Sequence, residues 1–565
     1  MANYVLGINS YLHDSSAALM KDGKVVFATE EERLSRLKKD ARFPVLSIRA
    51  ALEHAGIGVR DLDAVAFGWN KAAVTPLHTL TASVTGKLPR SRSYIGHSLM
   101  TIGRELRSGN GERNLKRAFG TEAARRVFHI DHHASHAWST YGLCGWDEAL
   151  VVVMDGRGAT QATTLYHARG EELKPIRVLK YPNSLGSFYE AFTDILGFER
   201  QNDEWKVMGL AAYGTPDRDL SEAIQVTDDG YQVNTRLLMG TTWGDLTEMR
   251  KQYGPRRNPE VLITDADRNL AASAQQALEK AVFALVKWGV KETGCRKLCL
   301  AGGVAMNSKA NGRLLASGLV DDVFVQPAAT DDGVAIGAAI AAHGRIGKAI
   351  PRYRLDEVYF GPEFSDDEIG ETLQTYKLPF VRSTDVERVT ADLLAKGKIV
   401  GWFQGRMEFG PRALGNRSIL ADPRRAEMKD RVNECVKFRE GWRPFAPSCT
   451  IEAAPDYFEG CREAPFMILT YDVLPDAGEK IPAVTHDDNT ARVQTVDRNV
   501  NPRYWRLINE FGAITGTPVI MNTSFNLRGE PIVCSPKDAI RTFYSSGLDY
   551  LVLGEFIVAK QQMWE

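Results

Sequence analysis

A pattern of three short strands opens this chain and returns further along it. Residues 4–28 contain three apolar strand-like runs, with the hairpin turn signal Asp22-Gly23 between the second and the third. Residues 149–179 show the same succession of a strand, a glycine-containing turn and two more strands. A pattern that recurs in one chain indicates a repeated structural unit. The sequence therefore predicts a duplicated α/β lobe in its N-terminal part.

A second domain is expected after this lobe, because 565 residues are too many for one hydrophobic core. Residues 297–343 contain two strand–loop–helix units, which place ligands at the carboxyl ends of strands. Proline, glycine and charged residues then collect around 346–370, as in a linker between domains. We predict a first α/β domain over residues 1–355 and a second over residues 370–565.

Composition and charge exclude several classes of protein. The chain is 44% hydrophobic and 25% charged, unlike a disordered chain, a collagen or a disulfide scaffold. Its 70 Lys and Arg balance 71 Asp and Glu, which gives no sign of bulk nucleic-acid binding. No apolar run reaches the about 18 residues of a membrane span, no basic leader precedes the first strand, and the seven cysteines are scattered. We expect a cytoplasmic protein that binds neither nucleic acid nor a membrane.

The strongest local signal is a cluster of three histidines. His132 and His136 are four residues apart, which places both imidazoles on one face of a helix, whereas His133 is out of phase. Asp155 and Asp331 each lie in a loop near a strand and are candidate carboxylate ligands. Such a set, without thiolates, suits Fe(II), Mn(II) or Zn(II). The alternatives are packed or surface histidines, and a simple turn role for Asp155.

Glycine loops and arginines are candidates for phosphate binding. The loops 155–158 and 301–303 would let backbone N–H groups approach a phosphate or ribose, although each can also be a tight turn. Arginines in Gly-, Pro- and Asn-rich loops are typical of bidentate phosphate binding, although any single one can be solvated. Their number in the C-terminal half favours a polyphosphate site. The basic residues concerned are Arg406, Arg412, Arg417, Lys437, Arg439, Arg443, Arg492 and Arg528.

Seven motifs resemble, in the right order, those of the NodU/CmcH family of O-carbamoyltransferases, enzymes that modify antibiotics and nodulation factors. The resemblance covers nearly the whole chain. The motifs are Leu12–Leu19 (LHDSSAAL), Glu30–Arg36 (EEERLSR), Asp131–Ala137 (DHHASHA), Lys206–Gly214 (KVMGLAAYG), Gly302–Asn307 (GGVAMN), Gly410–Ser418 (GPRALGNRS) and Asn522–Asn526 (NTSFN).

The resemblance implies a two-part α/β fold and a two-step reaction. The N-terminal part would be a duplicated actin/Hsp70-like (ASKHA) domain similar to TsaD, the tRNA threonylcarbamoyl-transferring protein, and the C-terminal part would be YrdC-like. The C-terminal part would form carbamoyl-adenylate from carbamoyl phosphate and ATP, with Mg(II). The N-terminal part would pass the carbamoyl group to a hydroxyl of a small-molecule natural product. The acceptor, attack through oxygen or nitrogen, and a homodimeric state stay open.

The resemblance also implies roles for individual residues. His13 would be the base or orienter of the acceptor hydroxyl, and Lys38 would stabilise charge near the reacting carbonyl. Fe(II) would be bound by His132, His136, Asp155 and Asp331. The adenylate would be held by Gly156, Gly302, Gly303 and Asn307. ATP and carbamoyl phosphate would be bound by Arg417, Lys437, Arg443, Arg492 and Arg528, with hydrogen bonds from Asn522 and Ser524; Arg417 and Arg443 would be catalytic.

Some stretches depart from the family pattern. Arg157 stands where the family often has glycine, and Asp203 stands where Gly-Glu-x-Lys usually begins. Residues 70–125 are the least recognisable, and we expect acceptor-specific contacts there. Two other functions compete: a tRNA threonylcarbamoyl transferase, which would need a basic RNA-binding face, and a sugar kinase or chaperone of the same superfamily, which would leave the histidines and the C-terminal half unexplained.

Overall fold

The computed structural model describes residues 2–10, 14–70, 77, 81, 111–120, 123, 126–239 and 245–560. It divides into two compact units: residues 1–31 with 41–355, and residues 32–40 with 356–565. The short segment Glu32–Asp40 therefore belongs to the second unit. The predicted first domain, residues 1–355, includes this segment. Within the described ranges, no helix is both long enough and apolar enough to cross a membrane.

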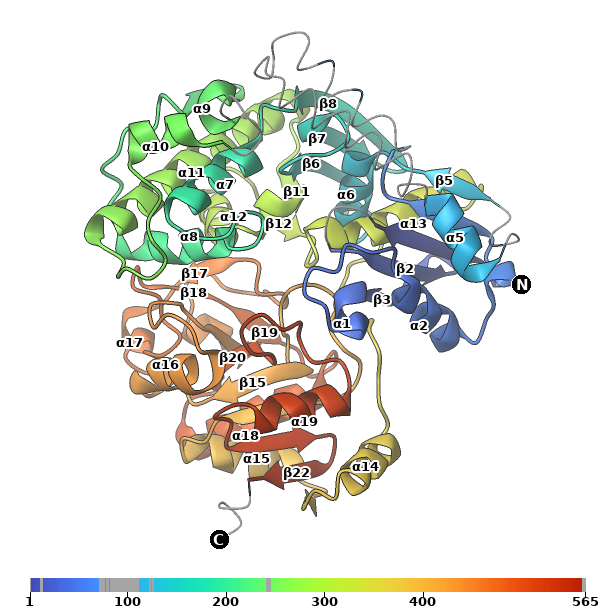
Figure 1. Ribbon diagram of the computed structural model, residues 1–565, viewed down its shortest axis with the longest axis vertical. Helices are drawn as coiled ribbons and strands as arrows, with labels where there is room; N and C mark the ends of the chain where they lie inside the picture. The colour runs from blue at the N-terminus through green and yellow to red at the C-terminus, as the bar shows by residue number, and fades with distance from the viewer. Residues whose placement is uncertain are drawn as a thin grey trace. The chain divides into compact units, whose positions relative to one another are not determined.

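Two mixed sheets in the described part of the first unit share one topology (Figure 1). In each sheet the first three strands form antiparallel pairs, and the fourth and fifth strands continue from the first in parallel. This repeat of order and direction is the duplicated α/β lobe that the sequence predicts. The first sheet contains β1 (Tyr4–Asn9), β2 (Ser16–Lys21), β3 (Lys24–Glu30), β4 (Ala64–Phe67) and β5 (Val127–His129); the second contains β6 (Glu148–Met154), β7 (Gln161–Arg169), β8 (Glu172–Lys180), β11 (Lys297–Ala301) and β12 (Asp322–Val325).

Two helices, α6 (His132–Tyr141) and α13 (Val334–Arg345), join these sheets. Helix α13 packs on β1, β2 and β4, helix α6 packs on β6, β7 and β11, and the two helices pack on each other. Gly337 allows their close approach, because a Cβ there would overlap the carbonyl oxygen of Ser135. The other helices of the unit include α2 (Val45–Ala55), α5 (Gly111–Phe119), α7 (Leu185–Ile195), α8 (Glu204–Leu210), α9 (Thr235–Met239), α10 (Thr247–Tyr253), α11 (Asp265–Thr293) and α12 (Ser308–Ala316), and a small hairpin pairs β9 (Ile224–Thr227) with β10 (Gly230–Val233).

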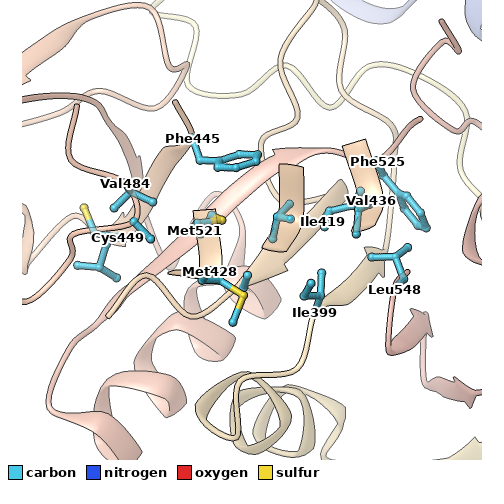
Figure 2. Packing of buried hydrophobic residues seen from close by; sticks show 14 of the residues in the cluster. Ile399, Ile419, Met428, Val436, Phe445, Cys449, Val484, Met521, Phe525 and Leu548 are labelled. Atoms are coloured by element: carbon cyan, nitrogen blue, oxygen red, sulfur yellow. The ribbon is translucent and has the colours of Figure 1, made fainter. Parts of the chain in front are cut away.

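The second unit is built on one mixed sheet with the strand order β13-β22-β21-β14-β15-β20-β16-β19 in its described residues. Successive residues of a strand enter alternate hydrophobic clusters: Phe403, Ile419 and Met521 join one, whereas Trp402 and Leu420 join the other. Figure 2 shows the first cluster around Ile419 and Met521. This alternation is expected of strands whose two faces are both covered.

The elements of this unit are as follows. The main sheet contains β13 (Val381–Arg382), β14 (Val400–Phe403), β15 (Arg417–Ala421), β16 (Ala446–Thr450), β19 (Gln494–Val496), β20 (Val519–Ser524), β21 (Tyr550–Leu553) and β22 (Phe556–Ala559), and a separate pair contains β17 (Thr470–Asp472) and β18 (Thr490–Arg492). The helices include α14 (Asp366–Thr375), α15 (Val386–Ala395), α16 (Glu427–Val432), α17 (Pro475–Gly478), α18 (Pro502–Thr515) and α19 (Pro536–Tyr544). The segment Glu32–Asp40 contains most of the short helix α1 (Glu31–Ser35).

Candidate functional site

The histidine pair lies on the first turns of α6. Asp131 caps this helix, and its side chain accepts a hydrogen bond from the backbone N–H of Ala134 at 3.1 Å. His132 and His136 are one turn apart and both are fully buried. The spacing therefore brings both imidazoles to one face, as the sequence predicts. His133 points elsewhere, and its Nδ1 lies 2.8 Å from Thr164 Oγ1.

Two carboxylates complete this cluster. Asp155 follows β6, and Asp331 opens the 3₁₀ turn (Asp331–Gly333) that leads into α13. His132 Nε2 lies 3.4 Å from Asp155 Oδ2 and 3.4 Å from Asp331 Oδ1, and His136 Nε2 lies 3.5 Å from Asp331 Oδ1. One nitrogen or oxygen of each of the four side chains lies within 4.8 Å of all the others. The structure thus brings together the four residues for which the sequence predicts a shared metal.

The surroundings fix the orientation of His132. Its Nδ1 lies 3.2 Å from the carbonyl oxygen of Gly68, which directs Nε2 towards the carboxylates. The indole of Trp69 stacks on the imidazole with 3.7 Å between ring centroids, and its Nε1 donates to Asn9 Oδ1 at 2.9 Å. Sequence reasoning did not single out Trp69 or Asn9, because neither belongs to a motif with chemical spacing.

Opposite charges dominate the electrostatics of the cluster. Burial lowers the pKa of His132, but the carboxylates of Asp331 and Asp155 outweigh it and raise this pKa to about 10. Burial acts to raise the pKa of Asp155, yet the hydrogen bond from His132 and the nearby imidazole charges bring it below its usual range. Burial, together with the charge of His132, lowers the pKa of His133 to about 3. His133 is therefore neutral at physiological pH.

The donor set fits a divalent transition metal. Two imidazoles and two carboxylates are ligands that Fe(II), Mn(II) and Zn(II) accept. His136 supports this fit, because its Nδ1 and Nε2 are buried and have no hydrogen-bond partner among the described residues. A buried polar atom without a partner is costly, and a metal bound at Nε2 would remove part of that cost.

The predicted nucleotide loops surround Asp155. The backbone N–H of Gly303 donates to Asp155 Oδ1 at 3.3 Å. Gly302 has a φ of 89°, and a Cβ there would overlap the carbonyl oxygen of Met154, so only glycine fits. Asn307 caps α12 by accepting from Ala310 N at 3.0 Å, and its amide also pairs with Gln275. The Asn307 side chain therefore caps a helix and pairs with another side chain.

An acid beside these loops was missed by sequence reasoning. Glu190, on α7, is largely buried, and burial raises its pKa to about 7 against the opposing effect of Arg200. Arg200 lies 3.5 Å from its carboxylate. A Cβ on Gly156 would come within 3.3 Å of Glu190 Oε1, which places this acid next to the loop after β6. A single glutamate in an amphipathic helix gives no local signal of this position.

In the second unit, five basic side chains act on one another electrostatically. Two of them, Arg412 and Arg492, have no hydrogen bond or ion pair from their side chains to the described residues, and the Nε of each is buried. Burial lowers the pKa of Arg412 to about 10, and burial with the charges of Arg412 and Arg439 lowers that of Arg492. The five residues are Arg412, Lys437, Arg439, Arg443 and Arg492. Cations held together in this way favour an anionic ligand.

Lys437 connects this cationic cluster to the loop after β20. It ends a one-turn π-helix (Asn433–Lys437), and its Nζ donates to the backbone oxygen and hydroxyl of Ser524 and to both oxygens of Asn526. Burial, together with Arg439 and Arg443, lowers its pKa well below the usual range. Arg443 lies 3.4 Å from Glu440, and Arg439 donates to Asn433 at 2.6 Å.

Two predicted phosphate ligands have other tasks. Arg417 is fully buried, and its guanidinium donates to backbone carbonyls that include Gln404 at 2.6 Å and Gly405 at 3.1 Å. It also lies over the ring of Phe403 at 3.6 Å from the centroid. Asn522 is buried and donates to Ala413, Ser448 and Gln494. The protein itself therefore occupies the polar groups of Arg417 and Asn522, whereas Arg412, five residues before Arg417, has a buried Nε without a hydrogen-bond partner among the described residues.

The remaining predicted residues are dispersed. Lys38 Nζ pairs with Glu32 at 2.7 and 3.1 Å from its two oxygens, and its side chain is 43% exposed. Arg528 is exposed on the loop after β20. His13 lies outside the described residues, as do most of residues 70–125, where acceptor contacts are expected.

Comparison with known sequences decides the family. A family model described as the carbamoyltransferase N-terminus matches residues 4–340, and one described as the carbamoyltransferase C-terminus matches residues 391–560. The chain belongs to the carbamoyltransferase family. These two matches, together with relatives that are similar along most of the chain, identify it as a carbamoyltransferase enzyme.

The relatives extend along most of the chain. Nodulation protein NolNO of Sinorhizobium fredii is 41% identical over 98% of this chain and 80% of its own length. Nodulation protein NolO of Bradyrhizobium diazoefficiens is 44% identical over 76% of this chain and 79% of its own. Among solved structures, HypF of T. kodakarensis is 15% identical, with a TM-score of 0.36 over 61% of this chain and 48% of that one.

Proposed function

We propose that this carbamoyltransferase activates its carbamoyl group with ATP and transfers it to a hydroxyl of a small molecule. The second unit would make carbamoyl-adenylate from carbamoyl phosphate and ATP, and the first unit would carry out the transfer. One observation carries the proposal: each unit has its own chemical cluster, basic in the second and histidine–carboxylate in the first. The two clusters suit two successive reactions of a phosphate-bearing substrate.

The basic cluster suits the activation step. The side chains of Arg412 and Arg492 have no hydrogen bond or ion pair to the described residues, so their guanidinium groups are available for phosphate oxygens. Pyrophosphate carries concentrated negative charge as it leaves ATP, and fixed cations stabilise that charge without reorganisation. Lys437 holds Ser524 and Asn526 beside the cluster, where they can hydrogen bond to the bound substrate.

The balanced reaction consumes water. Carbamoyl phosphate and water give carbamate and inorganic phosphate. A carbamate oxygen then attacks the α-phosphorus of ATP, the bond to the β-phosphate oxygen breaks, and pyrophosphate leaves with Mg(II). The acceptor hydroxyl later attacks the carbamoyl carbon, loses its proton, and displaces AMP.

The histidine–carboxylate cluster would hold Fe(II), with Mn(II) or Zn(II) as alternatives, on His132, His136, Asp155 and Asp331. A bound metal would supply positive charge to the phosphate and the reacting carbonyl group. The backbone N–H of Gly303 orients Asp155, and the Gly68 carbonyl orients His132, so these groups prepare the site before any ligand arrives. We infer that the adenylate lies along the loop from Asp155 to Gly158, next to Glu190.

The acceptor class is the least constrained part of the proposal. Two relatives are named nodulation proteins, and we infer for this chain an acceptor that is a small molecule with a free hydroxyl. Lys38 and His13 stay proposed neighbours of the reacting carbonyl. The competing function, transfer of threonylcarbamoyl to tRNA, would use the same cluster with a different acceptor.

The proposal is tested without an acceptor. Purified protein is incubated anaerobically with Fe(II), Mg(II), ATP and carbamoyl phosphate; pyrophosphate is assayed and carbamoyl-AMP is sought by mass spectrometry. Both products are expected. Formation of ADP in place of pyrophosphate would replace the proposal with kinase chemistry, and dependence on L-threonine in place of carbamoyl phosphate would favour the tRNA function.

A further inference from the structure

Two arginines, Arg33 and Arg36, hold two separate loops of the second unit by backbone carbonyls. Arg33 donates from Nη2 to Gly410 O at 2.9 Å. Arg36 donates from Nη1 to Ile532 O at 2.6 Å and from Nη2 to Pro531 O at 2.9 Å. The two side chains are only 3% and 17% exposed. Charge-assisted hydrogen bonds that are shielded from water in this way hold their partners firmly.

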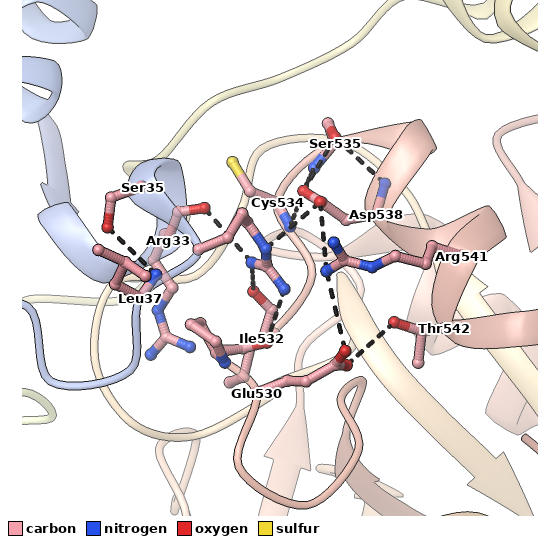
Figure 3. Close-up of polar contacts among 12 residues, drawn as sticks. Arg33, Ser35, Leu37, Glu530, Ile532, Cys534, Ser535, Asp538, Arg541 and Thr542 are labelled. Carbon is pink, nitrogen blue, oxygen red and sulfur yellow. Dashed lines mark hydrogen bonds and ion pairs between the residues drawn. The ribbon is translucent and has the colours of Figure 1, made fainter. Parts of the chain in front are cut away.

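Arg36 is also fastened to the start of α19. Its Nε lies 3.3 Å from Asp538, whose carboxylate accepts from Ser535 in a capping box. Figure 3 shows this network, in which Arg541 reaches towards both Asp538 and Glu530. The guanidinium of Arg36 is therefore fixed by a helix end as well as by the loop that it holds.

One of these loops carries a member of the basic cluster, and the other carries a hydrogen-bond partner of a member. Gly410 lies two residues before Arg412. Pro531 and Ile532 belong to the loop between β20 and α19, which also contains Asn526, a partner of Lys437. Arg33 thus holds the loop that carries Arg412, and Arg36 holds the loop whose Asn526 accepts a hydrogen bond from Lys437.

We propose that Arg33 and Arg36 are positioning residues of the phosphate site, and that the segment Glu32–Asp40 is a required part of the activation unit. The inference rests on the proposed function for the nature of the ligand. The sequence gives no sign of this role, because both arginines come shortly after β3, a strand of the first unit.

The physical reason is that the Arg412 side chain has no hydrogen bond or ion pair to any described residue. Its guanidinium group takes its position from the backbone that carries it, so a loop that moves would misplace this group. A misplacement of about 1 Å can reduce a reaction on the order of 100-fold. A lysine at position 36 keeps the charge but lacks the planar fork that reaches two carbonyls at once.

The test uses the full-length protein. Arg36→Ala and Arg36→Lys are compared with wild type, and Arg506→Ala is the control, because it removes an ion pair to Asp385 elsewhere in the same unit. Pyrophosphate release is measured against carbamoyl phosphate and ATP concentration. In Arg36→Ala the KM for carbamoyl phosphate is expected to rise on the order of 10-fold or more, with a smaller rise in Arg36→Lys, and Arg506→Ala is expected to match wild type.

Hydrogen–deuterium exchange on the ligand-free proteins gives a second, independent readout. Peptides that cover residues 524–535 are expected to exchange faster in both Arg36 variants, and peptides that cover residues 405–418 in Arg33→Ala, whereas peptides of β21 and β22 are not expected to change. Unchanged exchange and an unchanged KM overturn the positioning role. If wild type releases no pyrophosphate, the proposed function fails, and the exchange result alone then decides whether Arg33 and Arg36 each order the loop that they contact. If Arg36→Ala does not fold, Arg36→Lys decides both readouts.

Discussion

His136 Nε2 lies 3.5 Å from Asp331 Oδ1, although the two residues come from opposite halves of the duplicated lobe. His136 is on α6, which packs on the second sheet, and Asp331 begins the turn into α13, which packs on the first. Because the two helices pack on each other, the residues at their starts meet. The cluster is thus a product of the duplication, and it requires both halves.

Loss of His136 should separate the two steps of the proposed reaction. We expect His136→Ala to weaken metal binding at least about 10-fold, since even indirect supports of metal ligands cost that much. Carbamoyl transfer should be lost while pyrophosphate release persists, because the basic cluster lies in the other unit. Metal content by mass spectrometry and the two product assays check this, with His167→Ala, a partly exposed histidine of β7 that pairs with Glu148, as the control. Equal loss of both steps would refute the division of labour.

Loss of a basic residue should have the opposite effect. The single variants Arg492→Ala and Arg412→Ala are each expected to abolish pyrophosphate release. Each variant removes one guanidinium group from the cations that would stabilise the charge of the leaving pyrophosphate. Arg443→Ala should behave in the same way. Transfer from chemically supplied carbamoyl-adenylate should be retained in all three variants. A variant that still releases pyrophosphate at the wild-type rate would remove its arginine from the phosphate site.

Arg417 should matter for stability rather than for binding. Arg417→Met would remove the guanidinium donor from the carbonyl oxygens of Gln404, Asn416 and Gly405, and a buried carbonyl that loses its only donor costs about 1–3 kcal/mol. A loss of about 3 kcal/mol or more is expected, which corresponds to a Tm lower by roughly 6–12 °C. Thermal unfolding followed by circular dichroism checks it, beside the exposed Arg528→Ala as the control. An unchanged Tm with lost pyrophosphate release would return Arg417 to the phosphate site.

The comparison of Arg412 with Arg417 shows what sequence reasoning could reach. Both are arginines in one Gly- and Asn-rich motif, so composition predicts phosphate binding near them. Composition cannot tell which of the two guanidinium groups hydrogen bonds within the protein instead. That choice depends on carbonyls from Pro362, Gln404 and Cys534, which only the three-dimensional structure brings around Arg417. The duplicated lobe and the histidine pair were predictable, because strand and helix periodicity can be read from neighbouring residues in the sequence.

The roles of the segment Glu32–Asp40 and of Glu190 could not be predicted from the sequence. A change of unit within the chain leaves no trace in residue periodicity, so a linker between 346 and 370 was the only boundary that the sequence could indicate. Glu190 acquires its character from burial between α7 and the loop at Gly156. Burial of one side of an amphipathic helix is predictable, but a carboxylate at the edge of that side is not.

Glu190 should give the protein a pH-dependent stability that Gln removes. Burial raises its pKa in the folded state from 4.5 to about 7, so the protonated form favours folding. This contribution is complete below about pH 4.5 and is lost as the pH rises through 7. Since Gln cannot ionise, the stability of Glu190→Gln relative to wild type should increase between pH 5 and pH 8, by up to about 3 kcal/mol.

Thermal unfolding of both proteins at pH 5 and pH 8 measures this difference. Glu248→Gln is the matched control, because Glu248 is exposed and pairs with the neighbouring Lys251, where solvent screens the charge. The Tm of Glu190→Gln should approach or fall below that of wild type at pH 5 and exceed it at pH 8. A difference that stays constant, or that shrinks as the pH rises, would mean that Glu190 is ionised at both pH values and that Arg200 compensates fully for its burial.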